Sequence, residues 1–237
     1  MAFRGLSVLA VVPARGGSKS IPRKNLQPVG GISLVGRAGR LASSLACIDA
    51  AVISTDDDEI RAEAVKHGLD APFVRPAEFA SDTAKSVDMW RHAWLACEAH
   101  YGRRFDVSVL LEPTSPLRRD DDVLRTLAAL EDGNRAAAAT VSPTPAHFTP
   151  HKTLTVDEAG RIGFYLKDGQ KFALRQAIPK YFHRNGLCYA VRRTTLVDHG
   201  TILEEDCAAV VVERPLVNID EPFELELAGF LLAREAL

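Results

Sequence analysis

The stretch that decides the fold is SVLAVVPARGGSKSIPRKN, residues 7–25. Its first six residues are almost wholly apolar, which is typical of a strand that is covered on both faces within a parallel sheet. The remaining residues form a loop with four basic side chains, two adjacent glycines and two prolines. Such a loop directly behind a buried strand predicts an anion-binding turn at the carboxyl edge of an open α/β sheet.

The two glycines of this loop, Gly16 and Gly17, let backbone N–H groups converge on an anion, because glycine tolerates close approach and unusual dihedral angles. The basic side chains add charge for several phosphate oxygens at once; they are Arg15, Lys19, Arg23 and Lys24. The loop contains neither a GxxxxGK[ST] nor a GxGxxG pattern. A solvated basic turn is the alternative interpretation of the loop taken alone.

Outward from this loop, short apolar runs alternate with longer amphipathic stretches, which predicts βαβ units around a mostly parallel sheet. Further strands are expected at residues 50–55, 106–111, 136–142, 185–191 and 208–213. Between 81 and 102 we expect a helix capped by Ser81 or Asp82. The expected fold class is therefore α/β, Rossmann-like, with a mostly parallel open sheet flanked by helices.

The alternation of apolar runs and amphipathic stretches is interrupted between about Pro143 and Lys180. This segment has four prolines, short alternating strands and two turn signals, EAGR and KDGQ. It predicts a small insertion that contains a β-hairpin. We therefore expect an α/β domain over residues 1–142 and 184–237, with the insertion at 143–183.

Composition limits the classes of partner. The net charge of −2 provides no overall basic field, so no nucleic-acid partner is expected. No apolar run approaches the roughly 18 residues that a membrane span needs, so no membrane partner is expected either. The four cysteines are far apart and form no CxxC pair, which favours free thiols in a reducing cytoplasm over disulfides or a zinc site.

A second polar loop, LLEPTSPLRRDDDV (110–123), also follows an expected strand. Thr114 and Ser115 can donate hydrogen bonds there, and Arg118 can form a bidentate contact with a carboxylate or phosphate. Asp120 and Asp121 are interpreted as the cap of the next helix. The loop therefore adds candidate ligand-binding groups to the same edge of the sheet.

Acidic residues occur at two further points. In VNIDEPFELELA (217–228), Asp220 precedes a helix that starts with proline, and its carboxylate could hold Mg²⁺ or cap the helix; spacing favours neither role. In STDDDEI (54–60), three consecutive acids begin a helix. These are interpreted as a cap and a complement to the helix dipole rather than as a metal cluster.

Six segments, in order and spread over nearly the whole chain, resemble the acylneuraminate (CMP–sialic acid) cytidylyltransferase family. They are PARGGSKSIPRKNL, VISTDDDEI, RPAEFASDTA, LLEPTSPLR, RNGLCYA and IDEPFELELA. The resemblance implies that CTP reacts with a 2-keto-3-deoxy nonulosonic acid to give the CMP-sugar and pyrophosphate, with Mg²⁺. The anomeric hydroxyl would attack the α-phosphorus in line, so catalysis would rest on positioning and charge neutralisation.

The resemblance also implies roles for individual residues. The catalytic residues would be Arg15, Lys24 and Asp220. Nucleotide binding would fall to Ala14, Arg15, Gly16, Gly17, Ser18, Lys19, Lys24, Asn25, Arg75 and Ser81. Sugar-acid binding would fall to Glu112, Thr114, Ser115, Arg118, Lys152, Arg175, Asn185 and Tyr189. The metal ligands would be Asp220 and Asn218. Family members are dimers, so Lys152 and Arg175 of the insertion would serve the partner subunit's site.

Because of two departures from the family pattern, the sequence does not determine which sugar acid is the substrate. Glu112 stands where the family usually has glutamine, and Asn218-Ile219-Asp220 stands where close members have D-I-D. A carboxylate beside an anionic sugar acid is unfavourable unless it is paired or accepts hydrogen bonds from hydroxyls or an amine. The alternatives are a nucleotidyltransferase for a 3-deoxy-octulosonate-like acid or for another nucleoside triphosphate, and a non-catalytic nucleotide-sugar binding module.

Overall fold

The structure, a computed structural model, describes residues 3–172, 174–203 and 206–235. The chain divides into two compact units. Unit 1 consists of Met1–Thr140, Asn185–Val210 and Arg214–Leu237, and unit 2 of Val141–Arg184 and Val211–Glu213. None of the helices in the described ranges is long and apolar enough to cross a membrane.

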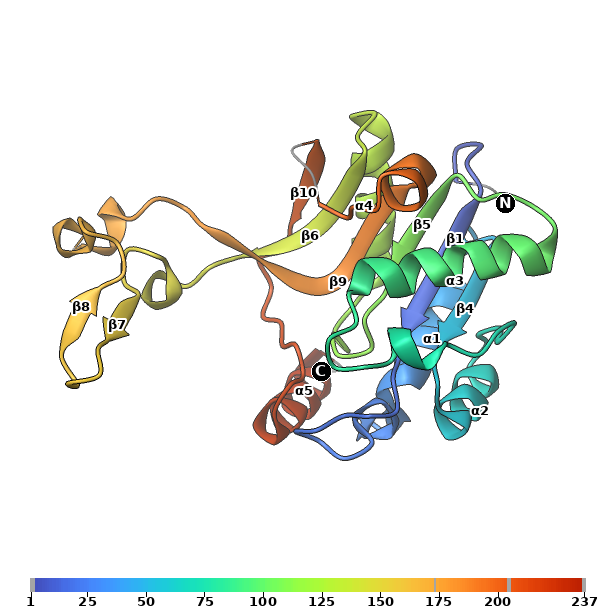
Figure 1. Ribbon diagram of the computed structural model, residues 1–237, viewed down its shortest axis with the longest axis horizontal. Coiled ribbons are helices and arrows are strands. Elements are labelled where there is room, and N and C mark those ends of the chain that lie inside the picture. The colour runs from blue at the N-terminus through green and yellow to red at the C-terminus, as the bar shows by residue number, and fades with distance from the viewer. Residues whose placement is uncertain (1–2, 173, 204–205, 236–237) are drawn as a thin grey trace. The chain divides into compact units, whose positions relative to one another are not determined.

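A six-stranded sheet with the order β10-β6-β9-β5-β1-β4 forms the frame. Its strands are β1 (Val8–Pro13), β4 (Ala50–Ser54), β5 (Val107–Leu110), β6 (Ala137–Pro143), β9 (Phe182–Arg192) and β10 (Cys207–Val211). The first strand, β1, pairs in parallel with β4 and β5, whereas β9 runs antiparallel to β5. Helices flank the sheet, and the expected α/β fold class is confirmed (Figure 1).

Helices cover both faces of the sheet, and the residues of β1 alternate between them. Val8, Ala10 and Val12 pack in one cluster with α1 (Leu34–Ser44), α2 (Asp58–Lys66) and α4 (Asp120–Asp132). Leu9 and Val11 pack on the other face against α3 (Ser86–Tyr101), whose Trp90 and Trp94 are fully buried. In Figure 1, α3 crosses the near side of β1 and β4. Burial on both faces explains why residues 8–12 are apolar throughout.

The remaining elements are short, apart from the last helix. They are η1 (Lys24–Leu26), β2 (Pro28–Val29), β3 (Ile32–Ser33), η2 (Ala77–Phe79), η3 (Ala146–Phe148), η4 (Gly169–Lys171), η5 (Arg175–Ala177), the π-helical turn η6 (Thr194–Asp198) and α5 (Pro222–Glu235). Proline opens α5, as expected for a position whose N–H would have no partner within the helix.

Of the three helix caps predicted from the sequence, the structure confirms one and contradicts two. Asp57 Oδ1 accepts from the N–H groups of Glu59 and Ile60 at 2.9 Å, so the acidic run 56–58 is confirmed as a cap of α2.

The cap expected at Ser81 or Asp82 is wrong, because α3 begins only at Ser86, with Lys85 at its N-cap position. The cap expected at Asp120 or Asp121 is also wrong. Arg119 holds the N-cap position of α4, and its N–H donates to Asp122.

Unit 2 contains the expected β-hairpin. Strand β7 (Leu154–Val156) pairs antiparallel with β8 (Ile162–Phe164). In the turn, Asp157 Oδ1 accepts from the N–H groups of Ala159 and Arg161 at 3.0 and 2.9 Å. Every residue of the two strands is exposed, so the hairpin contributes little to a core within unit 2.

Candidate functional site

A pocket of about 310 Å³ opens in unit 1 where β1 and β5 end. Side chains from four stretches line it: Pro13, Arg15, Lys24 and Asn25; Arg75, Phe79, Ser81, Asp82 and Ala84; Lys85, Ser86 and Met89; and Leu110, Glu112, Pro113 and Thr114. Four of them are basic and two are acidic, so the pocket carries a net positive charge. A concave, positively charged pocket at the carboxyl edge of the sheet suits a phosphate-bearing ligand.

The loop behind β1 folds closely against the acidic corner after β4. The N–H of Gly16 donates to Asp56 Oδ1 at 3.0 Å. A Cβ on Gly16 would lie 2.9 Å from Asp57 Oδ2, so the close approach requires glycine. The side-chain amide of Asn25, which is 7% exposed, donates to the carbonyl of Arg15 at 3.1 Å. Asn25 therefore holds the shape of the loop from within.

The other predicted loop residues lie around this turn. Ala14 is buried, and its N–H donates to the carbonyl of Ser54 at 3.0 Å. The N–H of Ser18 donates to the carbonyl of Gly16 at 3.1 Å. A Cβ on Gly17 would meet nothing within 4 Å. Gly17 thus has open space beside it, which leaves room for a ligand.

Arg15 and Lys19 both reach Asp82. Arg15 Nη1 donates to Asp82 Oδ1 at 2.8 Å, and Lys19 Nζ lies 2.5 Å from Asp82 Oδ2. The two cations hold the pKa of the Asp82 carboxyl below its usual range, Lys19 being the larger cause. This carboxylate therefore lies among the cations that the sequence assigns to phosphate.

Lys24 connects the loop to the segment before the last helix. Its Nζ donates to the carbonyl of Ile219 at 2.9 Å and to Asp220 Oδ1 at 3.0 Å. The N–H of Ile219 donates to the carbonyl of Thr114 at 2.8 Å, so this segment also contacts the loop after β5. Chain segments almost 200 residues apart thereby meet at one ammonium group.

The segment from Val217 to Asp220 alternates between buried and exposed residues. Val217 and Ile219 face the core, whereas Asn218 and Asp220 are exposed. The N–H groups of Asp220 and Glu221 donate to Glu224 Oε2 at 2.6 and 2.8 Å. Glu224 therefore serves the start of α5, and the carboxylate of Asp220 contacts Lys24 instead.

Arg75 lies against the end of β4. Its Nε donates to Ser54 Oγ at 3.1 Å, and Nη2 donates to the Ser54 carbonyl. It is 5% exposed, and burial lowers the pKa of its guanidinium to about 10. The guanidinium remains a cation at neutral pH and contributes charge to the wall of the pocket. Ser81 lies on the same wall and is exposed.

The loop after β5 places Glu112 against Gly186. A Cβ on Gly186 would lie 2.5 Å from both Glu112 Oε2 and Ser115 Oγ, and 3.6 Å from Asn218 Nδ2. Gly186 also has a φ of +72°, a conformation that favours glycine. Ser115 is fully buried and donates to the carbonyl of Asn185 at 3.0 Å. Gly186 thus makes room for the carboxylate beside Asn218.

Arg118 holds this loop to β9. Its Nε donates to the carbonyl of Leu187, and its Nη2 donates to the carbonyls of Glu112 and Gly186 at 2.6 and 3.2 Å. Burial lowers the pKa of its guanidinium to about 10. The sequence predicts a bidentate contact of Arg118 with an anion, whereas here three carbonyls engage the guanidinium.

Two further residues that the sequence assigns to the sugar acid lie in the interior. Asn185 is 6% exposed, and its Oδ1 accepts from Thr140 Oγ1 at 2.6 Å. Tyr189 is 7% exposed and belongs to the core cluster beneath α3. Their positions support the polypeptide around Glu112 and Ser115.

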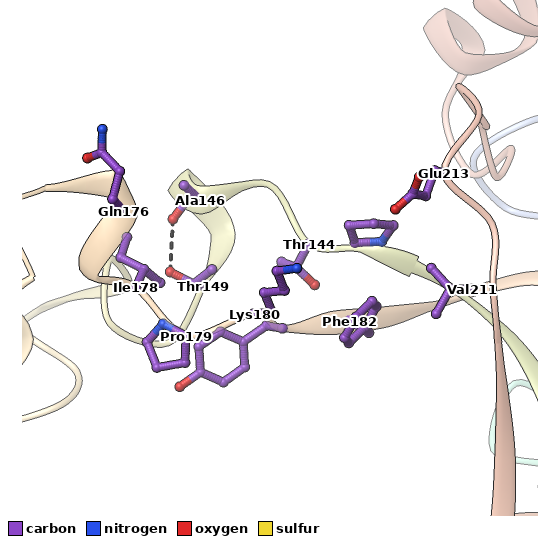
Figure 2. A pocket seen from close by; sticks show the side chains of 12 residues that line it. Thr144, Ala146, Thr149, Gln176, Ile178, Pro179, Lys180, Phe182, Val211 and Glu213 are labelled. Carbon is purple, nitrogen blue, oxygen red and sulfur yellow. Dashed lines mark hydrogen bonds between the residues drawn. The ribbon is translucent and has the colours of Figure 1, made fainter.

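Lys152 and Arg175 lie in unit 2. The N–H of Lys152 donates to the carbonyl of Thr149 at 2.9 Å. Arg175 begins η5, and its side chain lies outside the described part of the structure. Unit 2 has a pocket of its own, of about 640 Å³, and Figure 2 shows side chains that line it, among them Ile178, Pro179 and Phe182.

The expected metal ligands, Asp220 and Asn218, provide few donors. In the described residues, no group of three or more His, Cys, Asp or Glu side chains is placed to hold a metal ion. The Asp220 side chain is 71% exposed. Mg²⁺ often binds to one or two protein carboxylates and takes its other ligands from substrate phosphates and water. The residues therefore fit a magnesium ion that binds together with a polyphosphate.

Nine residues that line the pocket are not among the predicted site residues; they are Pro13, Phe79, Asp82, Ala84, Lys85, Ser86, Met89, Leu110 and Pro113. A helix capped by Ser81 or Asp82, as the sequence predicts, would contain both Lys85 and Met89. The start of α3 at Ser86 instead places the turn 81–85 at the pocket. In the sequence, the segment RPAEFASDTA is the signal for this wall of the pocket, because it contains Arg75 and Ser81 and runs into the same turn.

Comparisons with known proteins identify the family of the chain. The family model described as cytidylyltransferase matches residues 9–195, well over half of the chain. CMP-N,N'-diacetyllegionaminic acid synthase of Campylobacter jejuni is 26% identical over 231 residues, which cover 97% of each chain. Pseudaminic acid cytidylyltransferase of the same species is 28% identical over 225 residues, which cover 94% of this chain and 95% of the relative.

Solved structures show the same fold. CMP:2-keto-3-deoxy-manno-octonic acid synthetase complexed with CTP superposes with a TM-score of 0.70 at 20% sequence identity. The superposition covers 97% of this chain and 99% of that chain. At this identity the likeness shows a shared fold and carries no assignment of substrate.

Proposed function

The chain belongs to the cytidylyltransferase family, and from that premise we propose that it couples CTP to a nonulosonic, sialic-acid-like sugar acid, giving the CMP-sugar and pyrophosphate. Two relatives that align with nearly the whole chain have names that place them with such acids, legionaminic and pseudaminic acid. The observation that carries the proposal is Lys24, which lines the positive pocket and reaches Asp220 at 3.0 Å.

On the nucleotide side, we assign the triphosphate to the loop behind β1. Arg15, Lys19 and Lys24 supply charge, and the open space beside Gly17 admits phosphate oxygens. Asn25 maintains the loop through the Arg15 carbonyl, so its contribution to cytosine recognition would come through the positions of backbone groups as well as its own amide. Arg75 and Ser81 complete the nucleotide wall.

The chemistry proposed is direct displacement. The anomeric hydroxyl of the sugar acid attacks the α-phosphorus, and pyrophosphate leaves on the opposite side. Lys24 neutralises charge that develops on the leaving pyrophosphate, and its two contacts at Ile219 and Asp220 fix the ammonium before substrate binds. No side chain has to form a covalent bond in this scheme. Catalysis consists of positioning and electrostatic stabilisation.

On the sugar side, Glu112 and Thr114 line the same pocket as Lys24. We assign to the Glu112 carboxylate the hydroxyl or amide N–H donors of the sugar, because a second carboxylate from the acid itself would be repelled. Ser115, Arg118, Asn185 and Tyr189 are buried and would act by fixing this loop. The sugar carboxylate would then face the cations of the partner subunit's Lys152 and Arg175.

Magnesium remains part of the proposal. It would neutralise phosphate charge and orient the triphosphate, and Asp220 with Asn218 are the side chains we assign to it. Replacement of one carboxylate by the amide of Asn218 retains an oxygen donor but supplies no charge. We therefore expect weaker metal affinity than a pair of carboxylates would give.

We also propose a cytoplasmic homodimer. Large apolar side chains are exposed on unit 2, with exposed fractions of 76% for Phe148, 69% for Val156, 70% for Ile162, 63% for Tyr165 and 69% for Leu174. Exposed apolar surface of this kind is typical of interaction sites. All four cysteines are free thiols, which agrees with a reducing compartment.

The test is a substrate panel. Pyrophosphate release is measured with CTP, Mg²⁺ and neuraminic, legionaminic, pseudaminic and 3-deoxy-octulosonic acids, and each product is identified by its mass. We expect turnover with at least one nonulosonic acid, and none when GTP replaces CTP. Turnover only with the octulosonic acid would reassign the sugar. Binding of CTP without turnover on any acid would instead indicate a nucleotide-sugar binding module.

A further inference from the structure

Asp82 bridges two of the loop cations that we assign to phosphate, Arg15 and Lys19. Its Oδ1 faces Arg15 Nη1 at 2.8 Å, and its Oδ2 faces Lys19 Nζ at 2.5 Å. Two oxygens of one anionic group therefore engage two separate cations, as two oxygens of a phosphate would. A second carboxylate, Asp56, accepts the N–H of Gly16 in the same loop.

The chain around Asp82 allows this contact to be broken easily. Asp82 lies in a turn in which the N–H of Ala84 donates to the carbonyl of Ser81 at 3.2 Å, just before α3 begins. The exposed fractions of the side chains are 36% for Arg15, 78% for Lys19 and 47% for Asp82. The carboxylate can therefore turn toward solvent without opening the core.

The strength of the two ion pairs is suited to exchange with a ligand. An exposed pair of this kind changes an equilibrium constant by at most about fivefold. Two such pairs order the loop in the free protein, yet they are weak enough for an incoming polyphosphate to replace.

We propose that Asp82 is an internal counter-anion of the phosphate site, which competes with ligand phosphates for Arg15 and Lys19. This rests on the proposed function of the same pocket. Every anion that takes the two cations must displace the carboxylate at the same cost in free energy. Asp82 therefore weakens the binding of each such anion by the same factor, and it returns to the cations as pyrophosphate leaves.

The experiment is isothermal titration calorimetry of CTP and of inorganic pyrophosphate into the wild-type protein and three variants. Asp82→Asn removes the charge and keeps the shape. Asp82→Glu keeps the charge. Glu78→Gln is the matched control. Glu78 is an exposed residue of η2 in the same segment, and in the described structure its carboxylate pairs with neither Arg15 nor Lys19.

We expect Asp82→Asn to tighten the binding of CTP and of pyrophosphate by the same factor, about 3- to 10-fold. Asp82→Glu is expected to bind both ligands nearly as the wild type does. Glu78→Gln is expected to change either affinity by less than about twofold, because its exposed charge is screened by water and salt. Inhibition of turnover by pyrophosphate should strengthen in Asp82→Asn. Melting temperatures of all variants check that each is folded.

The proposal is overturned if Asp82→Asn binds pyrophosphate no more tightly than Glu78→Gln does, or more weakly than the wild type. Failure of the proposed function has a different signature. In that case the wild-type protein would bind pyrophosphate but not CTP, or would bind CTP without turnover, and the role of Asp82 would still be decided by the pyrophosphate titration.

Discussion

Lys24 and Asp220 form an ion pair of 3.0 Å between the loop that follows the first strand and the segment that precedes the last helix. The Lys24 side chain is only 14% exposed, whereas that of Asp220 is 71% exposed. The ammonium is therefore held in place and partly screened from water, with its second contact at the Ile219 carbonyl. This arrangement presents a fixed positive charge to the pocket.

The fixed charge of Lys24 gives the first prediction. Lys24→Ala should lower kcat about 10²- to 10³-fold, because one preorganised group that stabilises developing charge is lost. Lys66→Ala on α2 is the control, since its ammonium is 71% exposed and lies 3.6 Å from Glu63. Steady-state kinetics with saturating CTP measure both. Equal effects of the two substitutions would contradict the assignment of the loop.

The contact between Gly186 and Glu112 gives the second prediction. Gly186→Ala would place a Cβ 2.5 Å from Glu112 Oε2 and from Ser115 Oγ. We expect a higher KM for the sugar acid, because the carboxylate must move, and a loss of stability beyond the cost of the backbone conformation. The measurement combines kinetics with chemical unfolding.

Gly200→Ala is the control that separates the cost of the backbone conformation from the cost of the steric contact with Glu112 and Ser115. Gly200 has a φ of +71°, nearly the same as the +72° of Gly186, but a Cβ there would meet nothing within 4 Å. Its substitution should cost about 1–2 kcal/mol for the left-handed conformation alone. A Gly186→Ala variant that loses no more stability than Gly200→Ala and has an unchanged KM would refute the contact.

His92 gives a prediction about pH. It lies between Phe73 and Phe79, with ring centroids at 5.4 and 5.2 Å, and its Nδ1 is buried without a partner in the described structure. Burial lowers the pKa of its imidazole below 6.5, while Glu78 opposes the shift and Arg75 adds to it. The unfolded chain therefore binds more protons than the native protein as the pH falls through 6.5. Native stability should decrease over that window and level off below the native pKa.

His92→Phe tests this pH dependence. The variant keeps an aromatic ring against Phe73 and Phe79 but cannot bind a proton. Urea unfolding at pH 7.5 and at pH 5.5 should show a smaller loss of stability in the variant than in the wild type. The variant should also gain up to about 1 kcal/mol, since an unpaired buried nitrogen is removed. An identical pH dependence in both proteins would assign the effect to other groups.

The proposed dimer gives a prediction by subunit mixing. Lys24→Ala and Lys152→Ala should each be nearly inactive alone. If Lys152 serves the partner subunit, a mixed dimer has one site with both lysines and one site with neither. An equal mixture that exchanges subunits freely should then recover about a quarter of the wild-type activity, since half of its dimers are mixed. No recovery would place Lys152 in the site of its own subunit.

Mixing requires a dimer, and light scattering after gel filtration measures its mass. The double substitution Val156→Lys and Ile162→Lys adds charge to two exposed positions of the hairpin, where the side chains are 69% and 70% exposed. We expect a monomer with an unchanged fold of unit 1. A wild-type protein that is monomeric at enzyme concentrations, or a variant that stays dimeric, would move the interface away from the hairpin.

Much of this protein can be predicted from sequence, because local physical constraints determine it. Residues 8–12 are apolar throughout because both faces of β1 are buried, and the cap of α2 at Asp57 follows from acids that precede a helix. The cationic loop and the hairpin of unit 2 are likewise each encoded by a short run of consecutive residues. Each feature depends on neighbours in the chain, so its pattern is visible without a fold.

Only the tertiary structure decides which partners these groups meet. The sequence predicts that Arg118 is available to bind an anion, yet three carbonyls of the loop and of β9 accept hydrogen bonds from its guanidinium. Asp82 looked like a helix cap, but α3 begins four residues later and its carboxylate lies on Arg15 and Lys19. Lys24 meets Asp220 across 196 positions of the chain. The physical reason is the same in each case: an ionic or polar side chain is satisfied by whatever the fold brings within hydrogen-bond distance, and sequence spacing does not record that distance.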